Sequence, residues 1–251
     1  MTFLLNLITA AVLYGTPLLY GTTGEILTEK SGNLNLGVEG MMFMGGAVGL
    51  GAAFYYEKLT GAAVSAPLAV VIAIAGSFLA GAAGALIFSF LTITLRANQY
   101  VTGLALTFFG TGVGQYLGEF MRVQEGTYVA VSNTLKAAFN NSPFPAALQQ
   151  LPVVGSLLFG HSIFTYLGIA MAVALVIFCL WSPYRAIWGS ILFGGLLILY
   201  LRMPIDLIPD QIYKILPYVV TVVVLIFTSL RNNRDKQPPA SLGLAYFREE
   251  R

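Results

Sequence analysis

The chain has 251 residues, of which 57% are hydrophobic and only 10% are charged, and its formal net charge is +2. A soluble domain carries roughly 25% charged residues, so a soluble core could not bury this apolar excess and much of it must face lipid. The small net charge excludes a nucleic-acid-binding surface, and one cysteine with one histidine excludes a disulfide framework or a Cys/His metal cluster. The composition predicts an all-α membrane protein, a polytopic helical bundle.

The apolar residues fall into segments that match membrane-spanning helices, each of which needs about 20 mainly apolar residues. The clearest is 66–91, inside a charge-free run. Because no basic segment precedes the first, we interpret the N-terminus as a span and not as a cleaved signal peptide. The segments 41–56 and 186–201 are short, so either could be a partial or broken helix. The seven candidate spans are 3–20, 41–56, 66–93, 100–118, 163–181, 186–201 and 213–230.

A polar, glycine-rich stretch, residues 24–40, lies between the first two candidate spans and contains three glutamates, a lysine and two asparagines. Polar backbone in lipid is costly unless it lines a cavity or is buried in protein. One interpretation is a connecting loop whose glycines make turns. The other is a broken helix that ends near residues 30–32 and resumes near 39–41. Such a break would present Asn35 and Glu39 to a polar solute, and chemistry alone leaves both interpretations open.

A second polar cluster, residues 96–102, opens the 100–118 span. It also has two interpretations. In a short loop followed by a helix, Asn98 or Thr102 would cap that helix. In a transport pathway, the amides of Asn98 and Gln99 and the hydroxyl of Thr102 would face the solute. Arg96 is interpreted as an anchor at the membrane boundary.

Small residues recur at four-residue spacing, which lets helix backbones approach closely in lipid. We interpret these ridges as sites of helix packing. They are Gly45 and Gly49; Gly76, Ala80 and Gly84; and Gly110, Gly114 and Gly118.

The connections predict a transmembrane domain over 1–230 and a cytoplasmic tail over 231–251. Lys and Arg residues, counted over alternating connections, favour a cytoplasmic C-terminus. The proline-rich connection 119–162 is predicted to be an ordered external loop with short helices, of which 146–159 could lie along the membrane interface. His161 is predicted to be a surface residue of this loop.

Neither a catalytic triad nor a metal-ligand spacing is present among the polar residues. The chain also has no Walker A pattern, so it is not predicted to hydrolyse ATP. The sequence therefore predicts a protein that is not an enzyme and that needs no cofactor.

With these residues in view, the chain resembles permease subunits of bacterial ABC importers. The family is the branched-chain amino acid/ribose-type permease family, and the resemblance is closest to its nucleoside and simple-sugar branch. The motifs that carry it are Gly-Glu at 24–25, Glu-Lys-Ser-Gly-Asn-Leu-Asn-Leu-Gly-Val-Glu-Gly-Met-Met at 29–42, Leu-Arg-Ala-Asn-Gln-Tyr-Val-Thr-Gly-Leu-Ala-Leu-Thr at 95–107, Pro-Val-Val-Gly at 152–155, Val-Ile-Phe at 176–178, Trp-Ser-Pro at 181–183, Gly-Gly at 194–195 and the tail 240–251.

The resemblance implies a multi-pass protein of the bacterial plasma membrane that works with several partners. These would be a second related permease, two ABC ATPase subunits that drive transport, and an extracytoplasmic solute-binding lipoprotein. It also implies a substrate pathway. The residues that match the family's polar positions are Asn35, Glu39, Asn98, Gln99 and Thr102.

One departure from the family pattern concerns coupling to ATP. Family members carry a cytoplasmic coupling loop and further helices after the segment that matches 163–176. Here residues 170–175 run directly into the Val-Ile-Phe motif, so several dozen residues are missing near 175. The alternative hypothesis is therefore an internally deleted permease remnant, or a membrane scaffold, that does not couple to ATPases.

Overall fold

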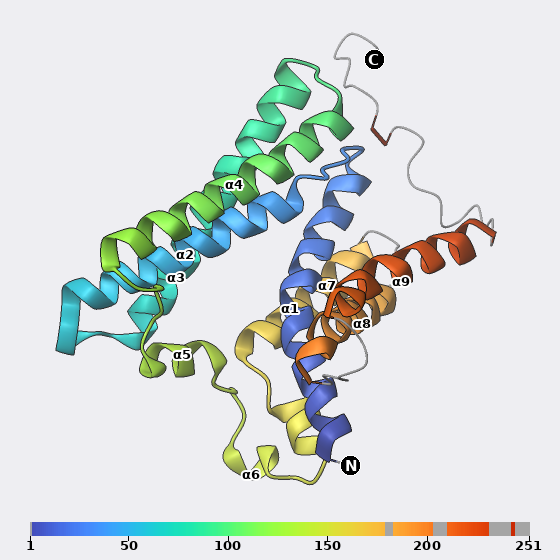
Figure 1. Ribbon diagram of the computed structural model, residues 1–251. Helices are drawn as coiled ribbons and strands as arrows, with labels where there is room; N and C mark the ends of the chain where they lie inside the picture. The colour runs from blue at the N-terminus through green and yellow to red at the C-terminus, as the bar shows by residue number, and fades with distance from the viewer. Residues whose placement is uncertain (1, 179–182, 203–209, 231–241, 244–251) are drawn as a thin grey trace. The chain divides into compact units, whose positions relative to one another are not determined.

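In the computed structural model, the described residues are 2–178, 183–202, 210–230 and 242–243. All elements in these ranges are helices, and none is a strand (Figure 1). In a bilayer a helix satisfies its own backbone groups, which explains this choice for so apolar a chain. The α-helices are α1 Thr2–Lys30, α2 Val38–Thr60, α3 Ala66–Ser89, α4 Gln99–Glu125, α5 Asn133–Asn140, α6 Ala146–Gln149, α7 Ile163–Phe178, α8 Pro183–Arg202 and α9 Asp210–Leu230. The short turns are η1 Gly61–Ala63, of 3₁₀ type, and the π-helical turns η2 Phe90–Thr94 and η3 Gly155–Phe159.

The helices confirm the predicted fold class, an all-α polytopic membrane protein. Within the described ranges, three helices are long and apolar enough to cross a membrane: Phe3–Lys30, Val38–Thr60 and Ala66–Thr94. Each predicted span falls in a helix, except that 179–181 lie outside the described residues. The number of seven spans stays a prediction, because the helices after α3 are shorter or less apolar.

Helix α2 is not the partial helix that its apolar core suggested. It has 23 residues and extends beyond 41–56 at both ends. The added turns contain Glu39 at the start and Lys58 near the end. Polar residues at the ends of a span cost little, because they reach the interface. Their polarity hid these turns from a count of apolar residues.

The described chain divides into two compact units. The first contains residues Met1–Leu27 and Asn141–Pro238, and the second contains Thr28–Asn140 and Pro239–Arg251. The break between α1 and α2 belongs to the second unit. Helix α1 therefore contributes most of its length to the first unit and only its last residues to the second.

In the second unit, α2, α3 and α4 lie side by side (Figure 1). Helix α3 returns the chain, so α2 and α4 run parallel. A Cβ on Gly103 would lie 2.7 Å from the nitrogen of Leu36, near the start of α2, and one on Gly51 would lie 3.0 Å from Met121, near the end of α4. The N-terminal ends of α2 and α4 therefore meet at the same end of the unit.

The small-residue ridges pack helices in this unit, as predicted. A Cβ on Gly45 would lie 3.1 Å from the carbonyl oxygen of Ser77 on α3. Gly110 faces the backbone of Gly40, where α2 and α4 cross. Gly118 differs, because a Cβ there would meet nothing within 4 Å.

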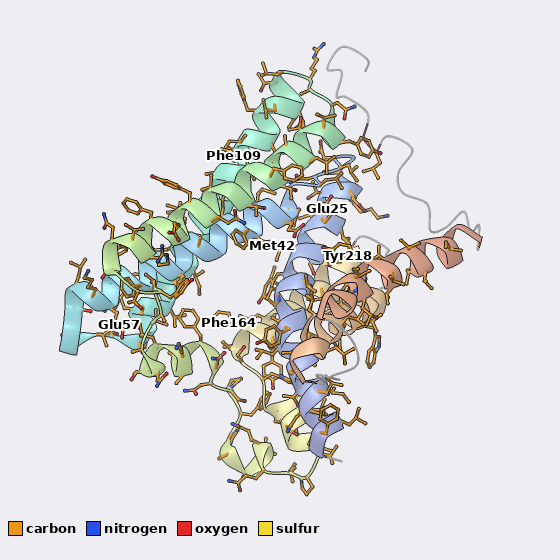
Figure 2. The ribbon with its side chains drawn as sticks, viewed as in Figure 1. Glu25, Met42, Glu57, Phe109, Phe164 and Tyr218 are labelled. Atoms are coloured by element: carbon orange, nitrogen blue, oxygen red, sulfur yellow. The ribbon has the colours of Figure 1, made fainter. Side chains whose placement is uncertain are left out.

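The opposite end of the second unit is held by polar contacts. Lys58 at the end of α2 pairs with Glu125 at the end of α4, with 2.7 Å between Nζ and Oε1. Figure 2 shows Glu57 beside the segment that leads into α5, where its carboxylate accepts a 3.0 Å hydrogen bond from the Ser132 N–H. The ends of α2 and α4 and the start of the next loop are thereby joined.

The predicted loop 119–162 begins later than expected. Helix α4 continues to Glu125 and ends at Gly126, whose φ of 68° is left-handed. The predicted short helices follow as α5, α6 and η3. Helix α5 contacts α3, and its Leu135 is fully buried. The position of this loop outside the membrane stays a prediction.

In the first unit, α1 packs against α7 and α8. A Cβ on Gly15 of α1 would lie 2.5 Å from the carbonyl oxygen of Ser190, so α1 and α8 touch through backbone. The hydroxyl of Tyr20 donates a 2.8 Å hydrogen bond to the carbonyl of Phe164 at the start of α7. The buried residues of this packing are Leu19, Ile26, Ala172 and Ala186.

Candidate functional site

The break between α1 and α2 is built from a glycine turn. Helix α1 ends at Lys30, and Gly32 has a φ of 87°. The N–H of Gly32 donates to the carbonyl of Glu29 at 3.0 Å, and that of Asn33 to Thr28 at 3.1 Å. These two bonds form a Schellman motif, which ends a helix with glycine in the left-handed conformation. The chain is therefore interrupted between α1 and α2 at the predicted place, which both the loop and the broken-helix interpretations expect, and residues 31–37 form what we call the connection.

The chain re-enters a helix at Val38 through a turn made by Asn35. Its side-chain oxygen accepts a 2.9 Å hydrogen bond from the N–H of Gly37, a local bond that favours turns. Gly37 has no room for a side chain, because a Cβ would lie 2.8 Å from Cδ2 of Leu106 on α4. Asn35 thus forms the turn locally, and the absence of a side chain at Gly37 lets Leu106 of α4 pack against it.

The second polar segment also lies between two helices. Helix α3 ends in the π-helical turn η2, followed by Arg96, whose φ of 54° is left-handed. Asn98 caps α4, since its side-chain oxygen accepts a 3.1 Å hydrogen bond from the N–H of Val101. The helix-cap interpretation of Asn98 is therefore correct.

The two polar segments meet through hydrogen bonds from α4. The Oε1 atom of Gln99 accepts from the N–H of Leu34 at 2.7 Å, and its Nε2 atom lies 3.5 Å from Oδ1 of Asn33. The hydroxyl of Thr107 donates to the carbonyl of Leu36 at 2.7 Å. This contact follows from the parallel course of α2 and α4, which brings their starts together.

The five predicted pathway residues all lie at this end of α2 and α4 but differ in exposure. Asn35, Gln99 and Thr102 are buried, with 6%, 3% and 6% of their surface exposed. Glu39 and Asn98 are exposed. The buried amides are engaged with the protein itself, whereas the two exposed side chains can reach a solute.

Thr107 was missed by sequence reasoning. A signal was available, because Gln99, Gly103 and Thr107 recur at four-residue spacing on α4 and so share one face. Gly103 lies between the two polar residues and touches Leu36. Thr107 was missed because this face of α4 is neither uniformly apolar nor uniformly polar, since it carries an amide, a glycine and a hydroxyl.

The electrostatics of the site are set by the two helix starts. Each helix N-terminus carries roughly half a positive charge from its backbone dipoles. Glu39 lies in the first turn of α2, where a carboxylate is favourable. The site therefore combines two helix starts with the exposed carboxylate of Glu39. Within the described residues, no group of three or more His, Cys, Asp or Glu side chains could hold a metal ion.

His161 is not the surface residue that was predicted. Only 6% of its surface is exposed, and its Nε2 atom lies 3.0 Å from the carbonyl oxygen of Leu157. Burial lowers the pKa of His161 below that of an exposed histidine. The loop folds back on itself through η3, which its many prolines and amides did not predict. The single cysteine, Cys179, lies outside the described residues.

The comparisons with known proteins decide the family. The family model of the branched-chain amino acid transport system permease component matches residues 6–192. The chain belongs to this family. It is therefore a membrane permease subunit of the ABC importer type, as the motifs at 29–42 and 95–107 predicted.

Three relatives show the range of the family members that this chain matches. A Haloferax volcanii protein, named provisionally as the glucose ABC transporter permease protein TsgC13, is 28% identical over 99% of both chains. The guanosine ABC transporter permease protein NupQ of Bacillus subtilis is 28% identical over 66% of this chain and 49% of its own length. The nucleoside ABC transporter permease protein NupC of Lactococcus lactis is 27% identical over 64% of this chain and 48% of its own length. No solved structure matches the chain.

The alignment with the archaeal relative is much longer than this chain. It extends over 339 positions and covers 99% of a chain of 251 residues. Several dozen positions of the relative therefore have no counterpart here. The matches to the two nucleoside permeases span about half of those proteins.

Proposed function

We propose that the chain is a permease subunit of an ATP-driven importer for nucleosides or related simple sugars and forms half of the translocation pathway. The observation that supports this most is the meeting of the two polar segments, joined by Gln99 and Leu34 at 2.7 Å, in a protein of this family. The relatives named for glucose, guanosine and nucleosides support the solute class.

The proposed partners follow from the family. They are a second related permease, ABC ATPase subunits and an extracytoplasmic solute-binding lipoprotein, assembled in a bacterial plasma membrane. Residues 1–230 would form the membrane domain and 231–251 a cytoplasmic tail. The chain itself would carry no catalytic site, and ATP would be hydrolysed by the partner subunits.

The proposed pathway residues are Asn35, Glu39, Asn98, Gln99 and Thr102. The carboxylate of Glu39 can accept a hydrogen bond from a sugar hydroxyl or a base N–H, and the amide of Asn98 can donate one. Alternating access around a broken helix uses such groups together with free backbone atoms. Asn35, Gln99 and Thr102 would shape the pathway from behind these exposed side chains.

Uptake of radiolabelled nucleosides and sugars tests the proposal in cells that contain the partner subunits. Glu39→Ala should lower uptake strongly, because it removes the exposed acceptor, and Asn35→Ala should do the same by loosening the turn. Glu119→Gln is the control, since this exposed carboxylate lies toward the other end of α4 and pairs with Arg122 on the same helix. Unchanged uptake with both Glu39→Ala and Asn35→Ala would show that the site is wrongly assigned.

A second candidate function is a remnant or scaffold that assembles in the membrane but does not couple to ATPases. It is favoured by the positions of the Haloferax volcanii relative that have no counterpart here. It is also favoured by the few residues of sequence between Phe178, where α7 ends, and Pro183, where α8 begins, which are too few for the family's coupling loop. Co-purification with the ATPase subunits separates the two candidates. An importer subunit retains an ATPase whose activity rises with loaded binding protein, whereas a remnant loses the ATPase or leaves its activity unchanged.

A further inference from the structure

The backbone of the connection needs partners that its own residues do not supply. Residues 33–35 lie outside any helix or turn, and Leu34 and Asn35 are buried, with 9% and 6% of their surface exposed. Buried N–H and C=O groups are almost always paired. The partners therefore have to come from a neighbouring element.

One face of α4 supplies them. Gln99 accepts from the N–H of Leu34 at 2.7 Å, and Thr107, two turns further along, donates to the carbonyl of Leu36 at 2.7 Å. Between them, Gly103 leaves room for the chain, because a Cβ there would lie 2.7 Å from the nitrogen of Leu36. An amide, a gap and a hydroxyl at four-residue intervals thus match backbone groups of Leu34 and Leu36 in the connection.

We propose that Gln99 and Thr107 are positioning residues that hold the backbone of the connection against α4 and act on the solute only through it. The Oε1 atom of Gln99 and the hydroxyl of Thr107 are directed at backbone groups of the connection. Gln99 has only 3% of its surface exposed, which leaves it unable to contact a solute directly. Gln99 therefore has a different role from the exposed Glu39 and Asn98. The effect on transport rests on the proposed function, whereas the hold on the backbone does not.

Hydrogen–deuterium exchange of the whole chain in lipid nanodiscs tests the hold directly. Thr107→Val keeps the shape of the side chain and removes the hydroxyl, and Gln99→Leu removes the acceptor. Each should raise exchange in the peptide that covers residues 31–37 by about tenfold, the effect of losing one hydrogen bond. Thr107→Ser keeps the hydroxyl and should leave exchange unchanged.

Thr111→Val is the matched control, because the Thr111 hydroxyl donates to the Thr107 carbonyl within α4 and not to the connection among the described residues. It should not change exchange in residues 31–37. Unchanged exchange in both Thr107→Val and Gln99→Leu would overturn the proposal. It would also be overturned if the controls Thr107→Ser and Thr111→Val raised exchange as much as Thr107→Val does. Uptake measured on the same variants separates the two proposals. If Thr107→Val and Gln99→Leu raise exchange but the unaltered chain shows no uptake, the hold on the backbone is supported and the importer function is refuted.

Discussion

The crossing of α2 and α4 depends on two glycines, and replacing one of them tests the packing of the second unit. In Gly110→Ala, the new Cβ would lie 2.7 Å from the Cα atom of Gly40. Carbon atoms pack at about 3.5–4.0 Å. The two backbones would therefore have to move apart by about 1 Å, since neither is the flexible end of a side chain.

The magnitude follows from two opposed terms. Alanine is better than glycine inside a helix by about 0.5–1 kcal/mol. Forcing extra volume into a packed interface costs about 1–3 kcal/mol. Gly112→Ala isolates the first term, because Gly112 lies on the same helix and a Cβ there meets nothing within 4 Å. We expect Gly110→Ala to be less stable than Gly112→Ala by about 1–3 kcal/mol.

The measurement is the free energy of unfolding in detergent, from a denaturant titration followed by circular dichroism. Gly112→Ala should unfold at a slightly higher denaturant concentration than the unaltered chain, and Gly110→Ala at a lower one. Equal stability of the two variants would show that α2 and α4 do not cross at Gly40 and Gly110. The contact between the two polar segments, which depends on this packing of α2 against α4, would then also lose its support.

Three further predictions concern single residues, each measured as the free energy of unfolding. Gly32→Ala should cost about 1–2 kcal/mol because of its left-handed backbone, whereas Gly24→Ala, inside α1 with open space around it, should stabilise slightly, as Gly112→Ala does; equal effects would contradict the Schellman turn. Because burial lowers the pKa of His161 below 6.5, the unfolded chain binds its proton more readily. Stability should therefore fall as the pH drops below about 6.5, and His161→Gln should reduce this dependence. Leu135→Ala should cost about 2–5 kcal/mol, whereas Leu59→Ala, at an 86% exposed position, should change stability by less than about 0.5 kcal/mol.

The fold class and the helix break could be predicted from the sequence because both depend on local physical rules. An apolar chain with few charges has to form helices in lipid, and glycine after a polar last turn ends a helix. The turn bonds made by the N–H of Gly32 and the side chain of Asn35 reach residues no more than four positions away. Such bonds are encoded in the local sequence, so the break was predicted to within a few residues.

The roles of the predicted pathway residues could not be separated in this way. Asn98 and Gln99 are neighbours in the sequence, yet one is an exposed cap and the other is buried against Leu34. That difference depends on how α4 is rotated relative to α2, which is set by contacts about 65 residues apart. His161 shows the same limit, because its burial comes from how η3 and the start of α7 fold around it.

The proposed deletion and the proposed site fall in different units, which has a consequence for both candidate functions. A deletion near residue 175, as the family pattern predicts, would fall in the first unit, whereas the connection and α4 belong to the second. Loss of the coupling loop would therefore leave the bonds of Gln99 to Leu34 and of Thr107 to Leu36 intact, since all four residues lie within residues 28–140. A chain that has lost ATP coupling should still show the exchange pattern of residues 31–37 described above. An intact connection is thus no evidence for transport, and uptake together with retention and stimulation of an ATPase has to distinguish an importer subunit from its remnant.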